Sequence, residues 1–204
     1  MITDRRRLKS DADLLVQRVG EAAAAGVDLV QVRERDLDAR ELSRLVTRCL
    51  DAARGTRTRV LVNDRLDVAL ATGAHGVHLR SDSMSAARAR SLAPVGFLIG
   101  RSVHSVNEAV RVAADGGVDY LLFGAVFATS SKPGHTPAGV GMLAEVAAAT
   151  SVPVLAVGGI TAETVTLLAG SGSAGFAAIG WFADGGDGVA REGVAAAARA
   201  FEKG

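Results

Sequence analysis

The chain has little cysteine and no long apolar run. Its 204 residues include one cysteine, Cys49, which cannot close a disulfide bond within the chain. Cys49 lies in the helix-like segment 45–50, where a buried thiol is favoured over a nucleophile. No segment approaches about 18 consecutive apolar residues, and residues 1–8 lack the apolar core of a signal peptide. We therefore expect a cytoplasmic protein without a membrane partner.

The chain also lacks an excess of charge of either sign. It holds 23 Lys and Arg residues against 22 Asp and Glu residues, which gives a formal net charge of +1. This charge is too small to attract nucleic acid regardless of its sequence, so we expect no nucleic-acid partner. Hydrophobic residues make up 49% of the chain, as in soluble globular proteins, and no Pro/Ser-rich linker divides it. We expect one domain over residues 1–204.

Short apolar, β-branched runs alternate along the chain with longer Ala-, Leu- and Arg-rich segments of helical spacing. The candidate strands are Leu29–Arg33, Arg59–Asn63, Gly76–Leu79, Phe97–Arg101, Tyr120–Gly124, Val152–Val157 and Gly175–Ile179. The candidate helices are Ala12–Ala25, Ala39–Ala53, Leu66–Ala71, Ser85–Leu92, Val106–Ala114, Gly141–Ala149, Ala162–Ala169 and Val189–Phe201. A short first strand that starts at Met1 would bring the strands to eight.

Eight strand–helix units predict an α/β fold, a single (β/α)8 TIM barrel with parallel strands, and an open doubly wound sheet is the alternative. A barrel gathers polar residues from all its strand ends, whereas an open sheet gathers them at one switch point. Here polar residues follow successive strands in the same place, which favours the barrel. They are Arg33–Arg35, Asn63–Arg65, His78 with Asp82, and Arg101–Ser102.

The loop after the strand at 120–124 is long and dense in hydroxyl groups. Thr129, Ser131 and Lys132 supply hydrogen-bond donors, and Gly134 lets the backbone approach a ligand or act as a hinge. We expect this loop to close over a phosphate group. A flexible surface loop has a similar composition, so the segment is a weak signal by itself.

The last two units carry glycines directly after their strands. Gly158–Gly159 and Ile179–Gly180 resemble the phosphate cradle of barrels, in which backbone N–H groups and the start of a short helix hold the anion. On the alternative interpretation, Gly158 and Gly159 only permit a tight turn. The four histidines do not fall at the spacing of zinc ligands, so we expect no zinc site.

Several short motifs follow one another along almost the whole chain. They are Gln31–Arg35, Val62–Arg65, Gly76–Leu79, Ile99–His104, Asp119–Tyr120, Phe123–Gly124, Thr129–Lys132 and Val157–Ile160. Read in this order, they resemble thiamine phosphate synthases and their TenI-like relatives. The resemblance implies an enzyme of thiamine biosynthesis. It joins hydroxymethylpyrimidine diphosphate to a thiazole phosphate and releases pyrophosphate. Because charge separates in this reaction, it requires cations around the leaving group more than a general base.

The resemblance also implies a role for each candidate residue, taken over by matching position. Arg33 and Arg35 would bind the pyrophosphate, with Arg35 where the family usually has lysine, and Asp64 would hold Mg²⁺. Ser102 would line the reacting centre. Lys132 would be the fourth catalytic residue beside Arg33, Arg35 and Ser102, as a further cation at the departing pyrophosphate. The substrate-binding residues would be Gln31, Asn63, Thr129, Ser131, Gly158, Gly159, Ile179 and Gly180.

Two departures from the family pattern concern the metal and the choice of activity. Ser83 stands where synthases carry a second Mg²⁺ carboxylate, so Asp82 would have to substitute for it, or Arg80 would neutralise the pyrophosphate directly. Ala125 stands where TenI-type thiazole tautomerases carry their catalytic histidine. In a tautomerase, His135 or His104 would have to replace it.

A tautomerase is therefore the second hypothesis, and a barrel that only binds thiazole phosphate or thiamine phosphate is the third. All three have small phosphorylated partners. Whether the chain forms a homo-oligomer stays open.

Overall fold

The computed structural model describes residues 1–129, 134, 136–184 and 188–201 of the chain. The chain divides into two compact units. The first unit comprises Met1–His78, Val95–Leu98 and Ile179–Val194. The second comprises Leu79–Pro94, Ile99–Ala178 and Ala195–Gly204. None of the described helices is long and apolar enough to cross a membrane.

Seven strands form one sheet, in which they follow the order of the sequence. They are β1 (Leu29–Val32), β2 (Arg59–Asn63), β3 (Gly76–Leu79), β4 (Leu98–Val103), β5 (Tyr120–Gly124), β6 (Val154–Val157) and β7 (Gly175–Ala177). The pairings β1–β2, β2–β3, β4–β5, β5–β6 and β6–β7 are parallel. All seven expected internal strands are thereby confirmed, with small shifts of their ends.

The expected eighth strand at the N-terminus is reduced to a single parallel bridge between Ile2 and Gln31. The backbone N–H of Gln31 donates to the carbonyl of Met1 at 2.9 Å, and that of Thr3 donates to the carbonyl of Gln31 at 3.0 Å. The chain then leaves the sheet at Asp4 and enters the 3₁₀ turn η1 (Arg5–Leu8). The early turn limits the pairing, so a full first strand is not present in the described residues.

The α-helices are α1 (Ala12–Ala24), α2 (Ala39–Ala52), α3 (Leu66–Thr72), α4 (Ala86–Leu92), α5 (Val106–Asp115), α6 (Gly139–Ala148), α7 (Gly180–Asp184) and α8 (Val189–Phe201). The prediction of a helix over 162–169 was wrong, because only the 3₁₀ turn η2 (Val165–Leu168) forms there. Thr164 explains the difference, since its hydroxyl donates to the carbonyl of Gly159 and accepts the N–H of Thr161. Such local bonds compete with helix formation.

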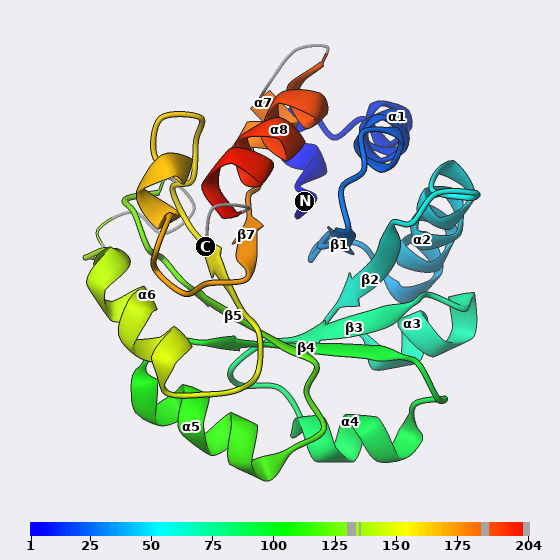
Figure 1. The fold of residues 1–204 in the computed structure, drawn as a ribbon. Helices are drawn as coiled ribbons and strands as arrows, with labels where there is room; N and C mark the ends of the chain where they lie inside the picture. Colours follow the sequence, from blue (N-terminus) through cyan, green and yellow to red (C-terminus); the bar gives the residue numbers. More distant parts are fainter. Residues whose placement is uncertain (130–133, 135, 185–187, 202–204) are drawn as a thin grey trace. The chain divides into compact units, whose positions relative to one another are not determined.

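In the first unit, α1, α2 and α3 lie side by side along one side of β1, β2 and β3 (Figure 1). A capping box between Asp38 and Glu41 starts α2. The buried face of α2 includes Leu42, Leu45 and Cys49. Because the Cys49 side chain is completely buried, the prediction of a structural thiol is confirmed.

In the second unit, α4, α5 and α6 accompany β4–β6 (Figure 1). Gly100 of β4 faces Tyr120 of β5 so closely that a Cβ atom at Gly100 would lie 2.1 Å from the Tyr120 ring. The carboxylate of Asp119 accepts the N–H of Ile99 at 2.6 Å and pairs with Arg90 at 2.5 Å. These contacts fix the start of β5 against β4, so the two strands present their carboxyl ends in register.

Candidate functional site

Gln31 and Asn63 lie together at the carboxyl ends of β1 and β2 in the first unit. The side-chain amide of Gln31 donates to Oδ1 of Asn63 at 2.9 Å. Gln31 is buried and Asn63 is half-buried. The bond fixes which side of the Asn63 amide carries the N–H donors. The structure therefore brings these two expected substrate-binding residues together, and Gln31 fixes the orientation of the Asn63 amide.

Asp64 follows β2 in a left-handed backbone conformation, with φ +64°. Its N–H donates to the carbonyl of His78 at 2.8 Å, which ties the turn to the end of β3. An aspartate tolerates this conformation better than most residues, but it remains costly. Backbone strain of this kind is concentrated at functional sites. The observation supports a functional role for Asp64.

Arg33 is a half-buried guanidinium group with charges of both signs nearby. Burial lowers its pKa, and the neighbouring Arg35 and Arg6 lower it further, while Asp4 and Glu34 act in the opposite direction. Among the residues that the structure describes, none forms an ion pair with Arg33. A partly buried cation without a fixed counter-ion favours the binding of an anion.

Glu34 was not among the candidate site residues, although it lies between Arg33 and Arg35. Its carboxylate is buried and accepts the Thr3 hydroxyl at 2.6 Å and the Arg5 N–H at 3.1 Å. Burial raises the Glu34 pKa, and the hydrogen bonds from Thr3 and Arg5 partly offset this effect. Glu34 therefore ties the N-terminal turn to the end of β1. The sequence signal was weak, because a carboxylate between two arginines is usually read as a surface ion pair.

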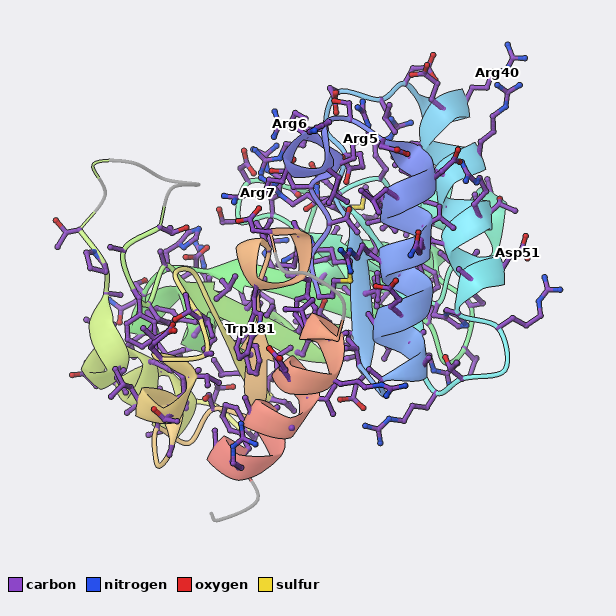
Figure 2. The ribbon with its side chains drawn as sticks, turned by 90° about the horizontal axis from the view of Figure 1, so that it is seen from above. Arg5, Arg6, Arg7, Arg40, Asp51 and Trp181 are labelled. Carbon is purple, nitrogen blue, oxygen red and sulfur yellow. The ribbon has the colours of Figure 1, made fainter. Side chains whose placement is uncertain are left out.

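Ile179 and Gly180 lie where the chain passes from β7 into α7, so the short helix expected there is confirmed. The carbonyl of Ile179 accepts the N–H groups of the first helical turn. A Cβ atom at Gly180 would lie 3.0 Å from the Asp184 carboxylate and 3.5 Å from the guanidinium of Arg7, and these two groups form an ion pair at 2.5 Å. Figure 2 shows Arg7 and Trp181 on neighbouring segments of the first unit. An ion pair thus lies beside Gly180, and the binding of a phosphate there stays a prediction.

In the second unit, Arg101 organises the loop after β3. Its buried guanidinium donates to the carbonyls of Met84 at 2.6 Å and Ser81 at 2.9 Å. Asp82 on this loop is exposed and forms an ion pair with Arg80. The expected second metal ligand is therefore engaged by a cation. Ser102, the next residue along β4, is half-buried at the strand end.

Gly158 and Gly159 form the turn after β6, with φ +99° and +65°. Cβ atoms there would lie 2.6 Å from the Ala125 side chain and 2.3 Å from the Ala128 carbonyl, respectively. The carbonyl of Gly158 also accepts the N–H of Phe127 at 3.0 Å. The two glycines are thus required for close packing of the turn, and their binding of a phosphate stays a prediction.

The remaining candidates belong to the loop after β5. Thr129 is half-buried. Ser131, Lys132 and His135 lie outside the described residues. The ring Nδ1 of His104 lies 2.7 Å from the carbonyl of Gly124, directly before Ala125.

The described residues hold no group of three or more acidic, histidine or cysteine side chains that would bind a metal ion. Mg²⁺, however, is commonly held by one or two carboxylates together with substrate phosphates. Asp64, in the first unit, and Asp82, in the second, are each a carboxylate of this kind, and their binding of Mg²⁺ stays a prediction.

The sequence and the fold both match known proteins. The family model described as thiamine monophosphate synthase matches residues 1–182. A thiamine-phosphate synthase of Methanoculleus marisnigri is 42% identical over 181 residues, which cover 88% of this chain and 82% of the relative. A putative thiamine-phosphate synthase of Geobacter sulfurreducens is 42% identical over 183 residues, 88% of this chain and 83% of the relative.

Among solved structures, thiamine phosphate pyrophosphorylase from Pyrococcus furiosus is 30% identical, with a TM-score of 0.85. The match covers 98% of this chain and 94% of that one. A 3-hexulose-6-phosphate synthase, 19% identical with a TM-score of 0.72 over 96% of this chain and 95% of that one, shares the fold. The chain belongs to the thiamine monophosphate synthase family.

Proposed function

We propose that the chain is a thiamine-phosphate synthase, which joins hydroxymethylpyrimidine diphosphate to a thiazole phosphate and releases pyrophosphate. The observation that carries the proposal is Arg33, a half-buried cation next to Arg35 without an ion-pair partner among the described residues. Relatives at about 40% identity carry the name of this activity. Both findings support a reaction in which a diphosphate leaves.

In the proposed reaction, the bond between the pyrimidine methylene carbon and the diphosphate oxygen breaks. The ring nitrogen of the thiazole then forms a bond to that carbon. Arg33 and Arg35 stabilise the negative charge that accumulates on the leaving diphosphate. Gln31 and Asn63 hold the pyrimidine substrate, and the bond between them keeps the Asn63 donors in one orientation. Ser102 lines the reacting centre.

The second substrate is held through its phosphate. We assign this role to the backbone N–H groups of Gly158, Gly159, Ile179 and Gly180, and to Thr129, Ser131 and Lys132 of the loop after β5. The positive φ angles of Gly158 and Gly159 support the assignment, because successive turns of this kind expose N–H groups. Lys132 adds a positive charge to these neutral donors.

Magnesium is proposed as the cofactor, with Asp64 as its main protein ligand and Asp82 as a second one. When bound, the ion neutralises negative charge on the phosphate oxygens. Asp82 has to leave Arg80 in order to take part, and Arg80 then remains as an extra cation for the diphosphate. The protein therefore contributes few metal ligands and several cations.

We further propose that the sheet closes into the eight-stranded barrel expected from the sequence, as one domain over residues 1–204. The Ile2–Gln31 bridge and the similarity to the P. furiosus structure over 98% of the chain support this fold. A cytoplasmic location follows from the small, water-soluble substrates of the proposed reaction. Homo-oligomer formation is left to measurement.

The test is a product assay with purified protein, both substrates and Mg²⁺. We expect thiamine phosphate and pyrophosphate in equal amounts, and loss of both in EDTA. Arg33→Gln should lower the rate at least about 100-fold, since one buried donor to a developing charge contributes about 10²–10³ in rate. Arg40→Gln, an exposed position on α2, is the matched control and should act as wild type. Substrate binding without any product would contradict the proposal.

A thiazole tautomerase is the second candidate, because His104 lies 2.7 Å from Gly124, next to the position where tautomerases carry their catalytic histidine. Such an enzyme should isomerise the thiazole carboxylate alone, without pyrimidine or metal. His104→Ala and His135→Ala identify the acid–base group if this activity is found. Tight binding of thiamine phosphate with neither activity would indicate a protein that only binds it.

A further inference from the structure

The N-terminal turn places three consecutive arginines beside the end of β1. Figure 2 shows Arg5, Arg6 and Arg7 together on this turn. Arg5 pairs with Asp36 at 2.7 Å, and Arg7 pairs with Asp184 at 2.5 Å. Each of these two guanidinium groups therefore has a carboxylate partner outside the turn.

Arg6 differs from its two neighbours. Its ion-pair partner is Asp4, at 3.2 Å, and the same carboxylate also lies 4.0 Å from Arg7. The Arg6 side chain is 60% exposed. The Asp4 side chain is only 15% exposed, but it keeps its contact with Arg7 when Arg6 leaves, and the exposed Arg6 can therefore exchange its partner.

The turn that carries Arg6 is fastened to Arg33 and Glu34 at the end of β1. The Thr3 hydroxyl accepts the N–H of Arg33 at 2.9 Å and donates to Glu34 at 2.6 Å. The N–H of Arg5 donates to both carboxylate oxygens of Glu34, each at 3.1 Å. These bonds hold the turn next to Arg33, and the charge of Arg6 is close enough to disfavour the charged form of Arg33.

Three guanidinium groups, those of Arg6, Arg33 and Arg35, thus lie at one strand end, where Arg35 and Arg6 lower the pKa of Arg33. Without an anion, the carboxylates of Asp4, Asp36 and Glu34 raise the pKa of Arg6. A diphosphate ester has more oxygen atoms than the guanidinium groups of Arg33 and Arg35 can bind. We propose that Arg6 is a further diphosphate-binding residue, which exchanges Asp4 for phosphate oxygens, and that buried Glu34 is the positioning residue for the turn that carries it. The inference rests on the proposed function, because it assigns the leaving group to this strand end.

The test measures the binding of inorganic pyrophosphate to the full chain by titration calorimetry. Arg6→Gln should raise Kd about 5- to 20-fold, near the lower end for a charge-assisted contact because the group is exposed. Arg40→Gln is the matched control, since Arg40 is also exposed in the first unit and projects from α2 away from the turn (Figure 2). Wild-type affinity in Arg6→Gln, or no binding of pyrophosphate by the wild type, would overturn the proposal.

Glu34→Gln tests the positioning role without a change of size. Burial already disfavours the Glu34 charge, so this variant should fold, and thermal melting checks that it does. We expect it to weaken pyrophosphate binding, and the double variant with Arg6→Gln should bind no more weakly than Arg6→Gln alone. Additive losses in this cycle would show that Glu34 does not act through Arg6.

Different results would refute the synthase activity and the role of Arg6. Pyrophosphate binding that depends on Arg6, in a protein that makes no thiamine phosphate, would refute the synthase and leave the binding residue in place. An active synthase whose Arg6→Gln variant binds pyrophosphate normally would refute only the role of Arg6.

Discussion

Asp64 combines a side chain proposed to bind Mg²⁺ with a strained backbone, and suitable substitutions separate the two properties. At φ +64°, asparagine is tolerated about as well as aspartate, whereas alanine is not. We predict that Asp64→Asn leaves the free energy of unfolding within about 0.5 kcal/mol of wild type, while Asp64→Ala lowers it by about 1–2 kcal/mol. Urea unfolding of the two variants measures the difference.

Both variants should lose most of the magnesium-dependent synthesis of thiamine phosphate, because both lack the carboxylate. Asp67→Asn on α3, which removes a nearby exposed carboxylate, is the control and should stay active. Full activity in Asp64→Asn would show that the carboxylate is not a metal ligand.

Single residues were predicted well where a side chain follows a strand, and less well where contacts join distant segments. Gln31, Asn63 and Asp64 lie at strand ends, as their positions after apolar runs indicated. The bond from Gln31 to Asn63 joins residues 32 positions apart, and no local pattern encodes it. The same holds for Glu34, whose partners lie near the N-terminus.

The contact between β4 and β5 gives a test of packing within an element pair. Because a Cβ atom at Gly100 would lie 2.1 Å from the Tyr120 ring, Gly100→Ala should lower the free energy of unfolding by about 1–3 kcal/mol. Gly141→Ala in α6 is the control, since nothing lies within 4 Å of the added atom. It should be neutral or stabilising by up to about 1 kcal/mol. If Gly100→Ala and Gly141→Ala change the Tm equally, the close contact between Gly100 and the Tyr120 ring does not limit the residue at position 100.

Burial on α2 shields the Cys49 thiol from reagents in solution. Burial raises the pKa of the Cys49 thiol to about 12. Because burial disfavours the thiolate in the folded state, the free energy of unfolding is unaffected by this group below about pH 9 and falls as the pH rises from about 9 to about 12. We predict that a thiol reagent at pH 8 labels Cys49 only after unfolding in denaturant. Rapid labelling of the native protein would place the thiol at the surface.

Among the elements, the strands were the most predictable, because each is a short apolar run between glycine turns. The segment 162–169 was assigned to a helix on composition, but three of its eight residues, Thr164, Val165 and Thr166, are β-branched. There the side chain of Thr164 bonds to local backbone, and only the turn η2 forms. The N-terminal strand was reduced to one bridge for a related reason, since η1 begins at Arg5.

At the scale of the whole molecule, the formal net charge is only +1, so anion binding must depend on local cationic groups. In the first unit, Arg33 and Arg35 follow β1 and Arg5, Arg6 and Arg7 lie on η1, and the bonds of Glu34 to Thr3 and Arg5 hold these two segments together. The fold class was predicted from the strand–helix alternation, and family membership from the order of the motifs. Neither the strand–helix alternation nor the order of the motifs predicted a role for the N-terminal turn, because Arg5, Arg6 and Arg7 have the pattern of ordinary surface residues.

The most direct test of the central claim is a crystal structure of the chain with its two products, pyrophosphate and thiamine phosphate, and Mg²⁺. We predict pyrophosphate within hydrogen-bond distance of Arg33 and Arg35, and the phosphate of thiamine phosphate on the backbone N–H groups of Gly158, Gly159 and Gly180. Pyrophosphate bound elsewhere, with Arg33 in contact with solvent or protein only, would contradict the proposed role of this strand end.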